Sequence, residues 1–261
     1  MSDNGTTEAP EGALLALRGV TKRFGAVQAL DGVDVDINAG EVVALVGDNG
    51  AGKSTLVKVI SGIYSPDEAA IWFDRQPVSI HGPGGAVRLG IATVYQDLAL
   101  CDNLDVVENM FLGHERRAGT GVFTRALDET SMERRSNELL ENLAVTIPNL
   151  RSEVGTLSGG QRQQVAVARS LLGEPKVVLL DEPTAALGVA QTAQVLALIK
   201  RLREHGLGVM VISHNLADVF EVADRIVVLR LGRVAGIYDA AKTNQNEIVA
   251  AITGARTEVA A

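Results

Sequence analysis

The sequence predicts an α/β fold with a mainly parallel central sheet, an antiparallel β flank and a helical insertion. Three observations carry this prediction. Several short runs consist only of β-branched and aliphatic residues, which is typical of strands buried on both faces. Other segments alternate apolar residues with aspartates, as strands do when one face meets water. A long middle stretch instead carries apolar residues at helical spacing among charged ones.

The antiparallel flank is predicted at residues 14–20, 33–37 and 70–73, of which the second alternates apolar residues with aspartates. The buried central strands are predicted at residues 42–46, 177–180 and 209–212. The insertion spans about 98–172, with a helix at 132–143 and a loop rich in glycine and threonine at 118–123. Residues 225–238 predict a hairpin that turns near Leu231 and Gly232, followed by a short terminal helix.

Length and composition favour one domain at residues 13–255 between short tails at 1–12 and 256–261, the first of which we expect to be disordered. Hydrophobic residues make up 46% of the chain, which allows a substantial core. The formal net charge of -8 argues against nucleic acid as a partner, because a polyanion would be repelled.

Two features of the sequence bear on where the chain lies, and the first favours the cytoplasm. Cys101 is the only cysteine, so no intramolecular disulfide can form, which fits a reducing compartment. The longest apolar runs fall far short of the roughly 18 residues that a membrane helix requires. We therefore expect any membrane role to be peripheral.

The buried run at 42–46 leads directly into the phosphate-loop pattern G-x-x-x-x-G-K-[ST], which opens a helix. Glycines let the backbone curl around phosphates, and the helix presents its positive end to them. We expect Lys53 to reach the β- and γ-phosphates, Ser54 to bind Mg²⁺ and Thr55 to contact another phosphate. The pattern alone leaves kinase, GTPase and ATPase open. The predicted nucleotide-binding residues here are Gly47, Asp48, Asn49, Gly50, Ala51, Gly52, Lys53, Ser54 and Thr55.

Two adjacent carboxylates end the buried run at 177–180, at the place where ligands bind in open α/β sheets. We assign Asp181 to the Mg²⁺ shell and Glu182 to the attacking water as general base. Taken alone, the segment could also be an acidic turn that ends a strand in solvent, helped by Pro183.

A second glycine pair lies at the start of a helix that we expect to begin near Arg162. Ser158 is the predicted N-cap, and the glycines expose N–H groups that could hold a second anion such as a γ-phosphate. An ordinary capped helix explains the same residues by local chemistry. The residues predicted to contact nucleotide here are Ser158, Gly159, Gly160 and Gln161.

The pentapeptide at 157–161, with the phosphate loop upstream and Asp181-Glu182 downstream, resembles the motif series of ABC ATPases. The resemblance extends from about Leu14 to Ala255. It implies a P-loop NTPase core with a helical subdomain at about 98–172, ATP and Mg²⁺ as ligands, and ATP hydrolysis.

Three further positions gain a role through this resemblance. Gln96, after a strand at 91–95, matches the glutamine that touches Mg²⁺ and water and senses the permease. His214 matches the histidine that contacts the γ-phosphate, and Phe24 matches the aromatic residue that stacks on adenine. Taken alone, Gln96 is a surface amide, His214 a helix-capping or solvated histidine, and Phe24 a core residue.

The sequence departs from the family at Gly188, where most members carry an aspartate. Glycine supplies no carboxylate, so we expect communication between the two sites of a dimer to be weaker or arranged differently.

The segments at 47–52, 95–100, 108–113 and 185–189 together resemble those of bacterial ribose/xylose/fructose-type sugar importers, and the single motif set resembles the shorter fructose or xylose type. This resemblance implies a head-to-tail homodimer with two ATPs between the phosphate loop of one copy and residues 158–161 of the other. It also implies transmembrane permease subunits and, indirectly, an extracytoplasmic sugar-binding protein. The chain would then lie at the cytoplasmic face of the membrane.

Two alternatives stay open at this point. An ABC ATPase outside transport usually carries coiled-coil inserts, two cassettes or basic surfaces, and this sequence displays none of them. A P-loop kinase for a small molecule would leave residues 157–161 without explanation.

Overall fold

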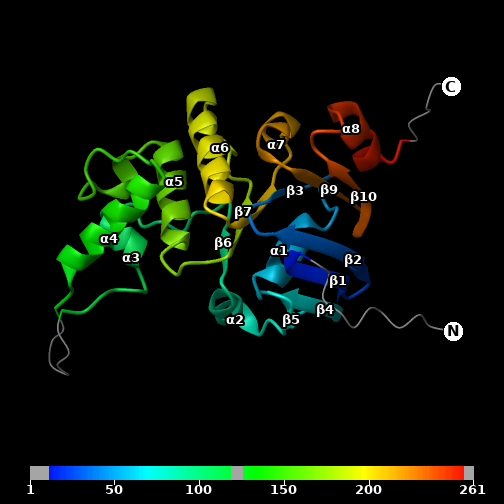
Figure 1. Ribbon diagram of the computed structural model, residues 1–261, viewed down its shortest axis with the longest axis horizontal. Helices are drawn as coiled ribbons and strands as arrows, with labels where there is room; N and C mark the ends of the chain where they lie inside the picture. Colours follow the sequence, from blue (N-terminus) through cyan, green and yellow to red (C-terminus); the bar gives the residue numbers. More distant parts are fainter. Residues whose placement is uncertain (1–11, 119–125, 256–261) are drawn as a thin grey trace.

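The computed structural model describes residues 12–118 and 126–255. Figure 1 shows a central sheet with three helices, α3, α4 and α5, gathered at one end and a second sheet at the other. The predicted tails lie outside the described residues except for Gly12, which forms a turn. The predicted loop at 118–123 also lies outside them except for Ala118.

The smaller sheet is antiparallel, as predicted. Its strand order is β2-β1-β4-β5. In β2, Val33, Val35 and Ile37 are buried while Asp34 between them is exposed, so the alternation in sequence marks the two faces. The strands are β1 (Ala13–Phe24), β2 (Val27–Asn38), β4 (Glu68–Phe73) and β5 (Gln76–Pro77).

The central sheet has the order β10-β9-β3-β8-β7-β6, and all neighbours pair in parallel except β10 with β9. This confirms the predicted parallel sheet and the predicted hairpin near Leu231 and Gly232. The strands are β3 (Val42–Gly47), β6 (Ile91–Val94), β7 (Val177–Asp181), β8 (Gly208–Ile212), β9 (Arg225–Arg230) and β10 (Arg233–Asp239).

Helices lie on both faces of the central sheet, and α3 and α4 pack on α5 beyond its end. They are α1 (Lys53–Ile60), α2 (Gly82–Leu89), α3 (Val106–Phe111), α4 (Glu129–Asn142), α5 (Gly159–Ser170), α6 (Val189–Glu204), α7 (Leu216–Val222) and α8 (Gln245–Thr253), with a 3-10 turn at Val154–Thr156. Because α3, α4 and α5 lie within 98–172, the predicted helical insertion is present, while its limits as a subdomain stay a prediction.

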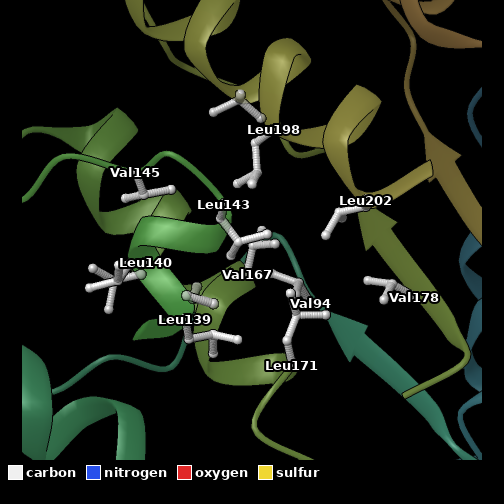
Figure 2. Packing of buried hydrophobic residues seen from close by; sticks show 14 of the residues in the cluster. Val94, Leu139, Leu140, Leu143, Val145, Val167, Leu171, Val178, Leu198 and Leu202 are labelled. Carbon is white, nitrogen blue, oxygen red and sulfur yellow. The ribbon is translucent and has the colours of Figure 1, made fainter. Parts of the chain in front are cut away.

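Burial of both faces explains why the central strands are continuous apolar runs. In β3, Val43 and Leu45 pack in the cluster that contains α1, whereas Val42 packs in the cluster that contains α4, α5 and α6. Figure 2 shows the second cluster, in which Leu202 of α6 lies toward Val94 of β6 and Val178 of β7, and Leu198 points toward Leu143. The aliphatic core thereby holds the parallel strands together with their carboxyl ends at one edge of the sheet.

The start of α5 differs from the prediction. The helix begins at Gly159 rather than near Arg162, because Ser158 caps it and both glycines join the first turn. Sequence analysis did not predict α2, where proline stands in the first turn beside three glycines. Proline is tolerated there because the first N–H groups of a helix have no partner within it.

Candidate active site

One edge of the central sheet gathers most of the predicted site. The phosphate loop follows β3, Asp181 ends β7, and His214 comes shortly after β8. These three strands are adjacent and parallel, so their carboxyl ends meet at the same edge. Gln96 follows β6, the next strand along.

The phosphate loop is held by close backbone contacts that admit only glycine. A Cβ atom added at Gly47 would lie 2.2 Å from the Leu229 carbonyl oxygen. At Gly52 it would lie 2.6 Å from the Ala29 carbonyl oxygen, and the φ of 107° there is itself unfavourable for other residues. The glycines therefore serve the shape of the loop, as the sequence pattern predicted.

Helix α1 presents free N–H groups to the loop. Its N-cap is Gly52, and no side chain in the described part of the chain caps it. The Lys53 ammonium group donates to the Gly47 and Asp48 carbonyl oxygens at 2.8 and 3.0 Å, so it folds back over the loop. Ser54 lies exposed in the first turn. This arrangement can hold an anion at a positive helix end.

Asp181 lies half-buried at the end of β7. Burial raises the pKa of its carboxyl group, and the neighbouring Glu182 carboxylate raises it further. The cations of Lys53 and Lys58 oppose this shift. A carboxylate that is costly to ionise beside two lysines is a suitable ligand for a divalent cation, which would offset the cost.

Glu182 occupies a left-handed backbone conformation, with φ 51°. Its N–H donates to the Ile212 carbonyl oxygen at 2.9 Å, which ties the turn to the end of β8. Its carboxylate oxygen Oε2 lies 2.8 Å from Nδ1 of His214. The structure thus brings together two residues that were predicted separately as general base and γ-phosphate contact.

Gln96 is exposed, and its side chain forms no hydrogen bond within residues 12–118 and 126–255.

Phe24 is 43% exposed at the β1–β2 turn, which does not fit the alternative of a core phenylalanine. Its ring packs edge-on against Tyr64 at 5.1 Å, and the Lys22 ammonium group lies 5.6 Å from its centroid. The ring can offer a face to a base.

The residues at 158–161 form the first turn of α5 and do not join the phosphate loop of the same chain. Ser158 and Gln161 hydrogen-bond reciprocally as a capping box. The glycines lie against α6, because a Cβ atom at Gly160 would meet the Gln191 Cβ atom at 2.9 Å. Helix α5 packs on α3, α4, α6 and β6, whereas α1 packs on β2, β3 and β7.

Sequence reasoning missed several residues that support the site. Tyr64 packs on Phe24, and the Thr184 hydroxyl donates to Asp218 at 2.7 Å, joining the turn after Glu182 to the helix after His214. These contacts join positions that are distant in sequence, so no local pattern predicted them.

None of the helices in the described stretches is long and apolar enough to cross a membrane.

The chain matches the ABC transporter family over residues 30–185. It is 48% identical to the fructose import ATP-binding protein FrcA of Rhizobium meliloti, over 93% of this chain and 95% of the relative. It is 48% identical to the xylose/arabinose import ATP-binding protein XylG of Sulfolobus acidocaldarius, over 92% and 94%. The ribose import ATP-binding protein RbsA 1 of Rubrobacter xylanophilus is 44% identical over 94% of this chain, which spans 48% of that relative.

Solved structures of ABC transporter cassettes are similar to this chain over most of its length. An ATP-binding cassette of an ABC transporter in its ADP conformation aligns with a TM-score of 0.78 and 26% identity, over 95% of this chain and 96% of that one. A dimeric cassette in a post-hydrolysis state, bound to ADP and Pi, aligns with a TM-score of 0.71 and 28% identity, over 87% and 98%. With its phosphate loop and paired carboxylates at one sheet edge, this chain belongs to the ABC transporter family as an ATP-binding cassette.

Proposed function

We propose that this chain is the ATP-hydrolysing subunit of an ABC importer for a monosaccharide. The observation that carries the proposal is the single sheet edge at which the phosphate loop, Asp181 and the Glu182–His214 contact meet. The named relatives import fructose, xylose or arabinose, and ribose. Which of these sugars the complete transporter carries is a property of its other subunits.

ATP would bind with its phosphates in the loop at residues 47–55. The uncapped N–H groups of α1 face this loop, and Lys53 would exchange two neutral carbonyl contacts for phosphate oxygens. Phe24 would receive the adenine, with Tyr64 supporting its ring from the side.

Mg²⁺ fits the donor set at this edge. Ser54 supplies a hydroxyl, Asp181 a carboxylate and Gln96 an amide oxygen, all of them oxygen donors of the kind that Mg²⁺ prefers. Burial raises the pKa of Asp181, and among the described residues no cation lies within ion-pair distance of its carboxylate. When bound, Mg²⁺ would neutralise charge on the β- and γ-phosphate oxygens.

Glu182 would act as general base toward the attacking water. His214 holds one carboxylate oxygen at 2.8 Å, which leaves the other oxygen to accept the proton. The side chain of His214 is 74% exposed, so the same residue could also contact a γ-phosphate.

The second half of each ATP site would come from a second copy of the chain. The first turn of α5, with exposed Ser158 and its two glycines, would face the γ-phosphate across the dimer. Gly188 supplies no carboxylate to this interface, and Val189 beside it is 91% exposed. We therefore expect an apolar contact between copies at this position.

The remaining partners would be transmembrane permease subunits, with an extracytoplasmic sugar-binding protein acting through them. The chain would lie peripherally at the cytoplasmic face of the membrane. ATP binding would favour the closed dimer, and hydrolysis would release it, so that the permease alternates its access.

The purified chain should release phosphate from ATP in the presence of Mg²⁺. Co-expressed with a sugar permease of the same organism, the chain should form a stable complex that hydrolyses ATP faster when sugar and binding protein are present. Transfer of the phosphoryl group from ATP to a sugar by the purified chain would contradict the proposal, as would stable association with DNA or ribosomes instead of the permease.

A further inference from the structure

The backbone after β6 carries Gln96 and is held mainly through side-chain contacts. Residues 95–100 form neither helix nor strand. Ala99 takes a left-handed conformation with φ 47°, and its N–H donates to the Asp97 carboxylate at 3.1 Å. A cavity of about 390 Å³ lies alongside, lined by Tyr95, Leu98 and Ala99 among others. The side chains of Tyr95, Leu98 and Leu100 pack on the two core clusters, but within the described residues the Leu98 and Ala99 carbonyl oxygens accept no backbone hydrogen bond. Another group is therefore needed to fix the orientation of the peptide unit between Leu98 and Ala99.

Arg169, from the last turn of α5, holds the segment from outside. Its Nη2 atom donates to the Leu98 carbonyl oxygen at 2.7 Å, and Nη1 donates to the Ala99 carbonyl oxygen at 2.8 Å. The guanidinium group is planar, so two bonds to successive carbonyls fix both the position and the orientation of that peptide unit.

The guanidinium group is partly desolvated where it makes these two bonds. Burial lowers the pKa of Arg169 from its usual range, although the group stays charged at neutral pH. Within the described residues no carboxylate lies within ion-pair distance of it. A half-buried cation without a carboxylate partner is costly unless its donors are used, and here the Leu98 and Ala99 carbonyl oxygens accept two of them.

Helix α5 connects this clamp to the other end of the proposed site. Ser158 caps the helix at its first turn, and Arg169 lies in its last turn. At about 1.5 Å of rise per residue, the two residues are roughly 16 Å apart along the helix axis. The middle of the helix, residues 163–168, is buried on all sides, and the helix packs on α3, α4, α6 and β6. A buried helix moves as a unit, so a shift of its first turn reaches Arg169.

We propose that Arg169 is a positioning residue that sets the backbone beside Gln96 and couples it, through α5, to the turn at Ser158. When the first turn of α5 engages a nucleotide held by the other copy, the helix shifts, and Arg169 moves the Leu98–Ala99 peptide unit with it. Gln96, two residues before Leu98, is thereby moved relative to Asp181. The inference rests on the proposed ATP hydrolysis and names a route by which the two halves of the site would act together.

The test compares two variants with a matched control. Arg169→Met keeps the length and loses both bonds, and Arg169→Lys keeps the charge but can hold one carbonyl at most. The control is Arg201→Met, because Arg201 also donates from a helix end to a backbone carbonyl, that of Leu143, far from the site. Unfolding midpoints of all three show any general loss of stability.

The clamp is measured directly by backbone amide exchange in the nucleotide-free full chain. We expect exchange in residues 96–101 to rise at least tenfold in Arg169→Met, less in Arg169→Lys, and not at all in Arg201→Met. Unchanged exchange in both Arg169 variants would overturn the proposal. Because no nucleotide is present, this result does not depend on whether the chain hydrolyses ATP.

The coupling is measured by ATP hydrolysis with the Gln96→Ala variant as background. In the otherwise wild-type chain, Arg169→Lys should lower kcat about tenfold and leave KM for ATP within twofold. In the Gln96→Ala background, the same substitution should lower kcat no further. Multiplied losses in the double variant would show that Arg169 acts independently of Gln96 and would overturn the proposal. If wild type and Arg201→Met both lack ATP hydrolysis, the proposed function fails instead.

Discussion

The Nδ1 atom of His214 lies 2.8 Å from the Oε2 atom of Glu182, across 32 positions of sequence. The two residues reach each other because β7 and β8 are adjacent and parallel, and because the Glu182 N–H is bonded to the carbonyl oxygen of Ile212 at the end of β8. One oxygen of the carboxylate is thereby oriented and the other is left for a water molecule. This relationship is the basis of the first prediction.

Replacement of Glu182 by glutamine should remove hydrolysis and spare ATP binding. Glutamine keeps the shape and one hydrogen-bond acceptor for His214 but cannot accept the proton, so kcat should fall by roughly 100-fold or more. Phosphate release and ATP affinity are measured together. Glu221→Gln, which changes an exposed glutamate of α7 paired with Lys200, is the control and should behave like wild type. Turnover in Glu182→Gln close to that of wild type would refute the role.

Replacement of Lys53 by alanine should weaken nucleotide binding itself. The ammonium group is held over the loop by the Gly47 and Asp48 carbonyl oxygens, where phosphate oxygens would replace them. Loss of a charge-assisted hydrogen bond predicts a decrease in ATP affinity of about tenfold to 100-fold. Equilibrium titration with a fluorescent ATP analogue measures it. Lys200→Ala serves as the control on the exposed face of α6, and equal affinities for the two variants would contradict the assignment.

Asp181→Asn should stabilise the nucleotide-free protein at neutral pH. The pKa of Asp181 is raised in the folded state, chiefly by burial, so the folded protein binds this proton more tightly than the unfolded chain. Wild-type stability therefore falls as pH rises from about 4, the unfolded pKa, through the raised folded pKa. Asparagine has no charge to bury and avoids this loss.

Thermal unfolding with EDTA, from pH 4 to pH 8, measures this difference. We expect the melting temperature of Asp181→Asn to exceed that of wild type at pH 7 and the two curves to converge toward pH 4. A difference that does not change with pH would show that the carboxyl charge is not its cause.

Gly52→Ala should destabilise the fold more than Gly50→Ala. Both glycines have positive φ, so both alanines carry backbone strain, but a Cβ atom meets nothing within 4 Å at Gly50 and lies 2.6 Å from the Ala29 carbonyl oxygen at Gly52. Strain together with overpacking predicts a loss of about 1–3 kcal/mol in the free energy of unfolding for Gly52→Ala. Urea unfolding without nucleotide measures both variants. Equal losses would show that the close contact carries no cost.

The sequence alone determined the central strands, the phosphate loop and the paired carboxylates. Each of these features depends on residues that are close together in the sequence. A strand buried on both faces requires an unbroken aliphatic run, and a loop that curls around phosphates requires glycine at fixed offsets. The hairpin at Leu231 and Gly232 was also predictable from a local pattern, because a turn that contains glycine separates two apolar strand segments. The start of α5 was placed too late, because glycines that interrupt most helices are tolerated in a capped first turn.

Only the tertiary structure decided which of these pieces face one another. The contact of Glu182 with His214, the hydrogen bond of Thr184 to Asp218 and the clamp from Arg169 to Leu98 each join residues on different elements. The order of strands in the sheet determines which of these residues come into contact. It also determines the burial that raises the pKa of Asp181. Strand order depends on how whole faces pack against each other, and no local pattern of residues encodes that sum of many weak contacts.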